Sequence, residues 1–258
     1  MSEKIIGIMG AMHEEINSIL HLMTGVEETS FGRRTYYTGT IHNIKTVVVF
    51  SRWGKVAAAT TVTSLITRFN VTDLIFIGVA GAIHTELKIG DVVIADRLIQ
   101  HDMDARPLMP RHEIPLLGLT YFESDPNYIT IAKRAIDAII GDNIHSFIEE
   151  HEIEQFSLQN TWVFKGTIAS GDKFFADQAD KEQLHAALPD TLCVEMEGAA
   201  VAQVCYEYEI PFVILRIISD ECNENSSIDF PDFIQNVSSK YAYEIIRNMF
   251  ALSSGLAL

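Results

Sequence analysis

The chain has 258 residues, of which 48% are hydrophobic and 21% are charged, and these proportions predict one compact domain with a large core. Its formal net charge at pH 7 is −16, so its surface would repel a phosphate backbone and we expect no nucleic-acid partner. No run approaches the roughly 18 to 20 apolar residues that span a bilayer, which predicts no membrane segment. The first residues do not resemble a signal peptide, so we expect a cytoplasmic protein.

Three cysteines lie far apart in the sequence and form no Cys-x-x-Cys pair: Cys193, Cys205 and Cys222. This spacing indicates neither a disulfide framework nor a zinc site. We therefore expect reduced thiols in or near the core.

Apolar, β-branched runs alternate with helical patterns along the chain. The runs that predict strands are Ile5–Met9, Lys45–Phe50, Leu74–Val79, Asp91–Ala95, Val163–Ala169 and Phe212–Ile218. Apolar residues at helical spacing lie between strands at Val62–Phe69 and again from Phe230 to Ile245. Nearly continuous apolar strands imply a sheet that is covered on both faces. The pattern thus predicts a single α/β domain over residues 1–258, with a parallel or mixed central sheet flanked by helices.

Two segments interrupt this alternation. Gly141–Asn160 is polar and holds four glutamates within six positions, which predicts a solvated surface insertion. Ala105–Gly118 contains three prolines, with Leu108 and Met109 between the first two, and this proline density predicts a loop. Apolar tips on such loops often cap a pocket or contact a partner.

Open α/β sheets bind ligands where their strands end, so polar or glycine-rich segments at those points are candidate sites. Gly10–Glu15 follows the first strand, but the dipole of a helix start explains Glu14 and Glu15 equally well. His13 and Glu14 lack the second histidine of a zinc-binding His-Glu-x-x-His helix. Gly78–Ala82 can cradle a small ligand or simply form a tight turn.

Two acidic segments follow later strands. Glu195–Glu197 lies between an apolar strand and an alanine-rich helix, and buried carboxylates there would need partners, whereas exposed ones would need no explanation. Arg216 lies within a core strand that ends at Asp220, an arrangement that is costly unless the charges are paired or used. Asp220 as the cap of the next helix is the alternative. His101–Asp104 has no further ligand cluster at an interpretable spacing, so we interpret it as structural and expect no metal site.

In this order and spacing, these segments resemble the 5′-methylthioadenosine/S-adenosylhomocysteine nucleosidase family of the purine nucleoside phosphorylase superfamily. The motifs that carry the resemblance are Gly7–Met12 with Glu15, Trp53–Ala58, Ser170–Asp172, Val194–Glu197 and Arg216-x-x-Ser219-Asp220. The resemblance runs from Lys4 to about Met249. It implies a nucleoside phosphorylase-like fold and hydrolysis of the bond between adenine N9 and ribose C1′, without a metal or organic cofactor. The 5′ group stays open among methylthioadenosine, S-adenosylhomocysteine, 5′-deoxyadenosine and aminodeoxyfutalosine.

The resemblance also implies residue roles. Asp220 would be the general acid that protonates adenine N7, Glu15 would orient and deprotonate the attacking water, and Glu197 would accept hydrogen bonds from the ribose hydroxyls. The base would stack on Phe174. The residues implied around the substrate are Ala11, Met12, Trp53, Val79, Phe174, Phe175, Glu195, Met196, Arg216, Ser219 and Phe230. Leu108 of a second subunit would close the 5′ end, which implies a homodimer.

One position departs from the family pattern, because Val79 stands where the family commonly has serine. A valine cannot donate a hydrogen bond to the water or to Glu15. Two alternatives follow. A phosphorylase of the same superfamily would need cations near the first strand end, where Glu14 and Glu15 would repel phosphate. A nucleoside-binding protein that has lost catalysis has only Val79 in its favour.

Overall fold

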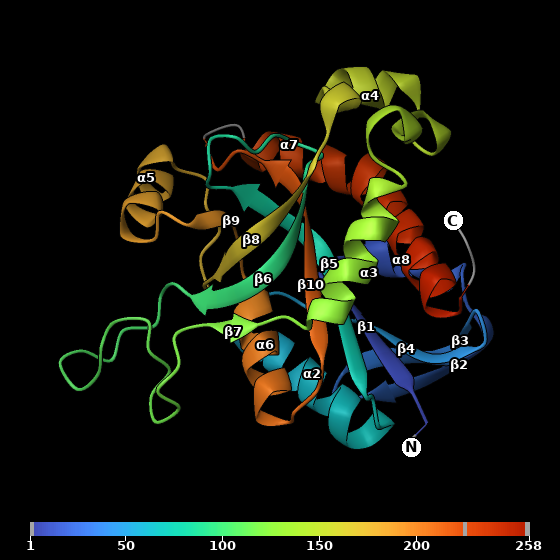
Figure 1. The fold of residues 1–258 in the computed structure, drawn as a ribbon, viewed down its shortest axis with the longest axis horizontal. Helices are drawn as coiled ribbons and strands as arrows, with labels where there is room; N and C mark the ends of the chain where they lie inside the picture. The colour runs from blue at the N-terminus through green and yellow to red at the C-terminus, as the bar shows by residue number, and fades with distance from the viewer. Residues whose placement is uncertain (1–2, 224–225, 256–258) are drawn as a thin grey trace.

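The computed structural model describes residues 3–223 and 226–255 as a mixed α/β domain (Figure 1). The strands are β1 (Ile5–Gly10), β2 (Thr24–Phe31), β3 (Arg34–Ile41), β4 (Ile44–Phe50), β5 (Asp73–Ala82), β6 (Val92–Gln100), β7 (Phe122–Glu123), β8 (Val163–Ser170), β9 (Thr191–Glu195) and β10 (Phe212–Asp220). The α-helices are α1 (His13–Leu20), α2 (Lys55–Phe69), α3 (Pro126–Asp137), α4 (Glu150–Phe156), α5 (Gln178–Ala187), α6 (Gly198–Glu207), α7 (Ser226–Phe233) and α8 (Ser239–Ser253). Three further turns are the 3₁₀ helices η1 (Gly141–Ser146) and η2 (Leu158–Asn160) and the π-helix η3 (Ile234–Ser238).

The strands form one mixed sheet in the order β10-β6-β8-β9-β5-β1-β4-β3-β2, with β7 at the edge of β6. β10 also pairs with β5, so β10, β6, β8, β9 and β5 form a closed ring of pairings. β5 runs parallel to both β1 and β10. Because the carboxyl ends of parallel strands meet at one edge, the segments that follow β1, β5 and β10 lie close together.

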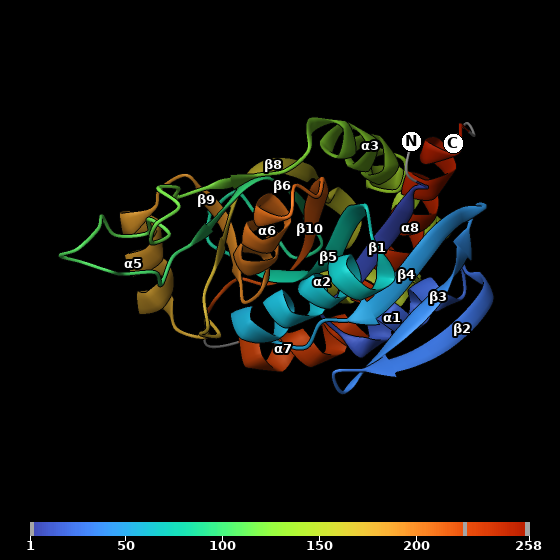
Figure 2. The ribbon, with the colours of Figure 1, turned by 90° about the horizontal axis from the view of Figure 1, so that it is seen from below.

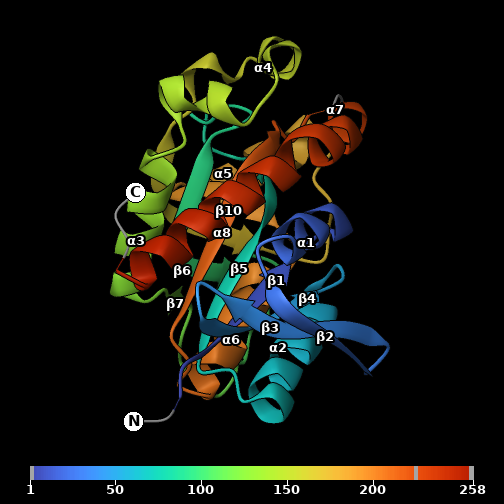
Figure 3. The same cartoon turned by 90° about the vertical axis from the view of Figure 1, so that its right-hand side faces the viewer.

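Both faces of the sheet are covered, as the apolar runs predict. Along β5, alternate side chains join different clusters: Ile75 and Ile77 pack with α1, α3 and α8, whereas Leu74 and Phe76 pack with α2 and α6. This alternation follows the two-residue period of a strand. Figure 3 shows α8 lying across the first face, and Figure 1 shows α2 and α6 below the sheet. The predicted fold class is confirmed.

The sequence pattern did not predict β2, β3 or β7. Nearly every residue of β2 is exposed, so its sequence lacks the apolar alternation that marks a half-buried strand. β2 and β3 form a hairpin with Gly32 and Arg33 at positive φ in the turn, and it projects from the body of the sheet (Figure 2).

The segment 141–160 is not purely a solvated excursion. It forms η1, α4 and η2, and Ile144, Ile153 and Phe156 pack into the core beside α8. Glu149 is exposed, as predicted, but Glu152 is buried and its carboxylate accepts a hydrogen bond from the Lys240 ammonium at 2.5 Å. The segment therefore has exposed glutamates on one side and a stripe of apolar side chains that packs into the core on the other.

Within the residues that the structure describes, no helix has the length and apolar character needed to cross a membrane.

Candidate active site

A cavity of about 370 Å³ opens where β1, β5, β9 and β10 end. Its lining residues are Ala11, Met12, Trp53, Val79, Ala80, Gly81, Phe174, Val194, Glu195, Met196, Glu197, Ser219, Asp220 and Phe230. Most of the predicted substrate-contacting residues are therefore brought together. Glu15 and Arg216 lie fully buried directly behind this lining, and Phe175 lines a small adjoining cavity.

Glu15 lies in the first turn of α1 and is held by three donors. Its Oε2 accepts the backbone N–H groups of Ala11 (3.1 Å) and Met12 (3.0 Å), and its Oε1 accepts the hydroxyl of Ser238 (2.7 Å). Burial raises the pKa of Glu15 to about 7, although the Ser238 hydrogen bond and the Arg216 charge oppose the rise. A carboxyl with this pKa can take up or release a proton near neutral pH.

Ser238 is a residue that the sequence analysis missed. It lies within the apolar helical stripe from Phe230 to Ile245, where a lone serine carries no signal of its own. Val79 presents two methyl groups to the cavity and cannot donate a hydrogen bond. Among the described residues, Ser238 is the one whose side-chain hydroxyl donates a hydrogen bond to Glu15.

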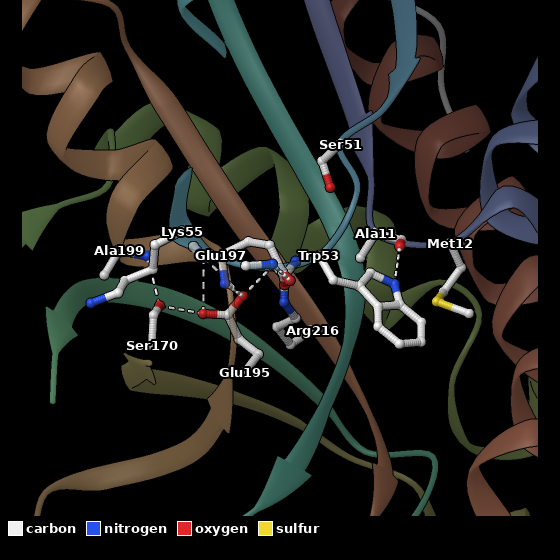
Figure 4. A network of polar contacts seen from close by, with 12 residues as sticks. Ala11, Met12, Ser51, Trp53, Lys55, Ser170, Glu195, Glu197, Ala199 and Arg216 are labelled. Atoms are coloured by element: carbon white, nitrogen blue, oxygen red, sulfur yellow. Dashed lines mark hydrogen bonds and ion pairs between the residues drawn. The ribbon is translucent and has the colours of Figure 1, made fainter. Parts of the chain in front are cut away.

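Glu195 and Arg216 form a fully buried ion pair at the back of the cavity (Figure 4). Arg216 Nη2 donates to Glu195 Oε2 at 2.6 Å, and the guanidinium lies 4.1 Å from the centroid of the Phe76 ring. Glu195 also accepts the backbone N–H of Gly198 and the hydroxyl of Ser170. Because both of its oxygens are occupied, Glu195 anchors the start of α6.

Glu197 has a different environment although it is only two residues away. Its Oε1 accepts the backbone N–H of Gly54 at 2.9 Å, and its Oε2 lies 4.0 Å from Arg216 Nη2. Burial and the neighbouring Glu195 carboxylate raise the pKa of Glu197 well above its ordinary value. Glu197 thus keeps acceptor capacity on the cavity side.

A ring of three hydrogen bonds fixes the Gly54 backbone against Glu197. The Lys55 N–H donates to Asp172 Oδ1 (2.9 Å), the Asp172 N–H donates to Asp102 Oδ2 (3.0 Å), and the Lys55 ammonium donates to Asp102 Oδ1 (2.6 Å). The ring joins the start of α2 to the loops after β6 and β8. Asp102 therefore accepts hydrogen bonds from two other segments, and the described part of the chain holds no group of three or more side chains that could hold a metal ion.

Asp220 ends β10 beside Gly81, after a bulge at Ser219. Its Oδ1 accepts the Cys222 N–H at 2.9 Å, and its Oδ2 lies 2.9 Å from the Ser219 hydroxyl, which also approaches the carbonyl of Ala80 at 3.4 Å. A bulge of this kind redirects a side chain at a sheet edge. The helix-cap alternative is wrong, because the three residues that follow Asp220, namely Glu221, Cys222 and Asn223, are not helical.

Aromatic side chains form one wall of the cavity. The rings of Phe174 and Phe230 meet edge to face with centroids 5.8 Å apart. The Trp53 indole lies at the mouth, where it is 59% exposed and donates to the Ala11 carbonyl at 3.1 Å (Figure 4). Such faces suit a planar base and an apolar sugar substituent.

The three cysteines are free and buried, which confirms the prediction of unpaired core thiols. Leu108, in contrast, lies outside this cavity. It is 88% exposed in the long loop between β6 and β7, which projects from the body of the domain (Figures 1 and 2).

Comparisons with known proteins agree with this geometry. Residues 5–251 match the family model of the phosphorylase superfamily. The chain is 34% identical over 246 residues to the 5′-methylthioadenosine/S-adenosylhomocysteine nucleosidase of Staphylococcus carnosus, covering 95% of this chain and 98% of that one. It is also 34% identical over 246 residues to the aminodeoxyfutalosine nucleosidase of Helicobacter pylori, covering 93% and 97%.

A solved structure is similar as well. The 5′-methylthioadenosine/S-adenosylhomocysteine nucleosidase of Neisseria meningitidis, in complex with methylthio-immucillin-A, superposes with a TM-score of 0.83 at 31% identity, covering 96% of this chain and 98% of that one. This chain belongs to the 5′-methylthioadenosine/S-adenosylhomocysteine nucleosidase family. The carboxylate-lined cavity at the strand ends is therefore the candidate active site of this chain.

Proposed function

We propose that this chain hydrolyses the N9–C1′ bond of 5′-methylthioadenosine and S-adenosylhomocysteine and releases adenine. The observation that carries the proposal is the arrangement of three carboxyl groups around one cavity with an aromatic wall: Glu197 and Asp220 line the cavity, and Glu15 lies buried directly behind the lining. No metal or organic cofactor is needed, because carboxyl groups can supply both the acid and the base.

Asp220 acts at the base end of the cavity. As the N9–C1′ bond breaks, its electron pair moves to the adenine and a proton from Asp220 goes to N7, so adenine leaves as a neutral molecule. The Ser219 hydroxyl lies within reach of both Asp220 Oδ2 and the Ala80 carbonyl. It can therefore donate to an ionised Asp220, or turn to Ala80 and accept from a protonated one.

Glu15 and Glu197 act at the sugar end. Glu15 takes the proton of the water that attacks C1′, and its pKa of about 7 suits a base at neutral pH. Glu197 accepts hydrogen bonds from the ribose hydroxyls. In their ionised forms, both groups stabilise the positive charge that develops on the sugar in the transition state.

The backbone that follows β1 favours hydrolysis over phosphorolysis, because it offers no free site for phosphate. The N–H groups of Ala11 and Met12, which a phosphate at this helix start would use, are already occupied by Glu15 Oε2. A carboxylate in this place repels a second anion. The complete set of three carboxylates likewise disfavours a binding protein without catalysis.

The direct test is adenine release in phosphate-free buffer. We expect release of adenine together with the free sugar, and comparison of kcat/KM for methylthioadenosine, S-adenosylhomocysteine, 5′-deoxyadenosine and aminodeoxyfutalosine will define the preferred 5′ group. Adenine release that requires phosphate and yields a sugar 1-phosphate would contradict this proposal and would support the phosphorylase alternative. Tight nucleoside binding with no turnover would replace it with the binding protein.

We further propose a cytoplasmic homodimer in which Leu108 of one subunit closes the 5′ end of its partner's cavity. The support is the exposed apolar tip: Leu108 is 88% exposed and Leu116 is 90% exposed on the same projecting loop. Leu108→Asp should weaken substrate binding by about tenfold, the scale of losing one buried apolar side chain, while thermal stability stays near wild type. A fully active wild-type monomer in sedimentation runs would contradict the dimer.

A further inference from the structure

Ser238 lies in an unusual turn of the chain. It ends the π-helix η3, which separates α7 from α8. Single π-helical turns are rare and are frequently found at functional sites. Ser238 is fully buried, and Ile234 and Val237 of the same turn are buried in the core. A hydroxyl in such surroundings needs a partner.

That partner is Glu15, 223 positions away in the sequence. Ser238 Oγ donates to Glu15 Oε1 at 2.7 Å, while the two backbone N–H groups of Ala11 and Met12 hold only Oε2. Without Ser238, Oε1 would have no hydrogen-bond donor among the described residues. The carboxylate plane is therefore fixed from both sides.

We propose that Ser238 is the positioning residue for Glu15, holding its carboxylate in the orientation that accepts the proton of the attacking water. The inference rests on the proposed function. It also accounts for Val79, which presents only methyl groups to the cavity, because Ser238 of η3 supplies a hydroxyl to Glu15.

Ser238 should then set the ionisation of Glu15 as well as its orientation. The Ser238 hydroxyl, the Arg216 guanidinium on β10 and the Ala11 and Met12 amides all lower the pKa of Glu15, and Arg216 is the one charged group among them. Loss of the hydroxyl removes one of these effects. A net hydrogen bond of about 0.5 to 1.5 kcal/mol corresponds to a shift of roughly 0.4 to 1 pH unit.

The test compares Ser238→Thr with Ser238→Val, two side chains of nearly equal shape of which only threonine has a hydroxyl. We expect the acidic limb of the kcat/KM profile to stay in place in the threonine variant. In the valine variant it should move upward by about half a pH unit or more, with a loss of roughly 3- to 10-fold near pH 6 that narrows above pH 8. Ser239→Ala, the same kind of change one residue on, is the control and should match wild type.

Several results would overturn the proposal. Equal pH profiles of kcat/KM for Ser238→Thr and Ser238→Val would contradict it. A rate loss in Ser238→Val that is the same at every pH, with the acidic limb unmoved, would also contradict it, because such a loss indicates only a packing role. If only the valine variant fails to fold, Ser238→Ala takes its place with the same expected shift. Failure of the proposed function is distinguishable, since wild type itself would then release no adenine in phosphate-free buffer.

Discussion

Glu195 and Glu197 share one short segment but differ in what surrounds their carboxylates. Glu195 is bonded through both oxygens to Arg216, Ser170 and the start of α6. Among the described residues, the Gly54 N–H is the one hydrogen-bond donor to Glu197, and burial together with Glu195 raises the pKa of Glu197. A carboxylate whose acceptors are all satisfied stabilises the fold, whereas one with free acceptors can bind substrate.

The short sequence motif around Glu195 and Glu197 therefore does not show which glutamate stabilises the fold and which one binds substrate. Glu195 ends β9 and Glu197 lies two residues later; both are buried, and both lie near Arg216. The roles separate only when the hydrogen bonds are counted. Substitutions that change one of the two glutamates and leave the other intact test whether their roles differ.

The largest effect is expected on stability from Glu195→Gln. Removing its charge leaves Arg216 buried with Glu197 4.0 Å away as the nearest acid, so the free energy of unfolding should fall by about 3 to 5 kcal/mol. Urea unfolding followed by circular dichroism measures this. Lys133→Met, which removes an exposed pair with Asp137, serves as control and should change stability by less than about 1 kcal/mol. An unchanged midpoint in Glu195→Gln would remove the anchoring role.

A second prediction concerns Asp220, the proposed general acid, and its replacement by asparagine. The amide preserves the shape of the carboxyl group but cannot deliver a proton to N7, so kcat/KM should fall by about 100-fold or more. Steady-state assays with methylthioadenosine measure the loss, and a thermal melt checks the fold. Rates near wild type would exclude Asp220 from the mechanism.

The pH dependence of stability should report the two buried carboxyl groups whose pKa values are raised. Glu15 and Glu197 both have raised pKa values in the folded chain, so the stability that their protonated forms contribute is present at low pH and is lost as pH rises through about 7 for Glu15 and higher for Glu197. Without ligand, Tm should fall by about 5 °C between pH 6 and pH 9. Glu15→Gln should flatten this trend, and an equally steep trend in that variant would show that other groups cause it.

The smallest effect is expected from Val79→Ser. Ser238 already donates to Glu15, so a second hydroxyl at position 79 should preserve adenine release or raise it by no more than about tenfold. Phosphate-free assays measure the change. A rise of several hundredfold would mean that the valine, and not the Ser238 bond, limits the placement of the water.

Much of the fold was predictable because buried strands have continuous apolar sequences. β1, β5 and β10 were found in this way, and the rule that ligands bind at strand ends then marked the segments that hold Glu15, Glu197 and Asp220 as candidates. The roles of these three residues were implied by the family resemblance. β2 was missed because both of its faces are exposed, and the core packing of 141–160 was hidden by its glutamates.

The rest of the site depends on contacts between distant parts of the chain. The bond between Ser238 and Glu15 and the ring of Lys55, Asp102 and Asp172 each join elements far apart in the sequence. No local pattern encodes such pairs, because their geometry is set by how the helices and loops pack. The distinction between Glu195 and Glu197 is of the same kind.

The most direct test of the account is Glu197→Gln, measured for both activity and unfolding. Because Glu197 is poorly satisfied in the free protein and acts on the ribose, kcat/KM should fall by about 100-fold while the free energy of unfolding stays equal to wild type or rises. Full activity in this variant, or a loss of stability as large as that of Glu195→Gln, would contradict the assignment of the two glutamates.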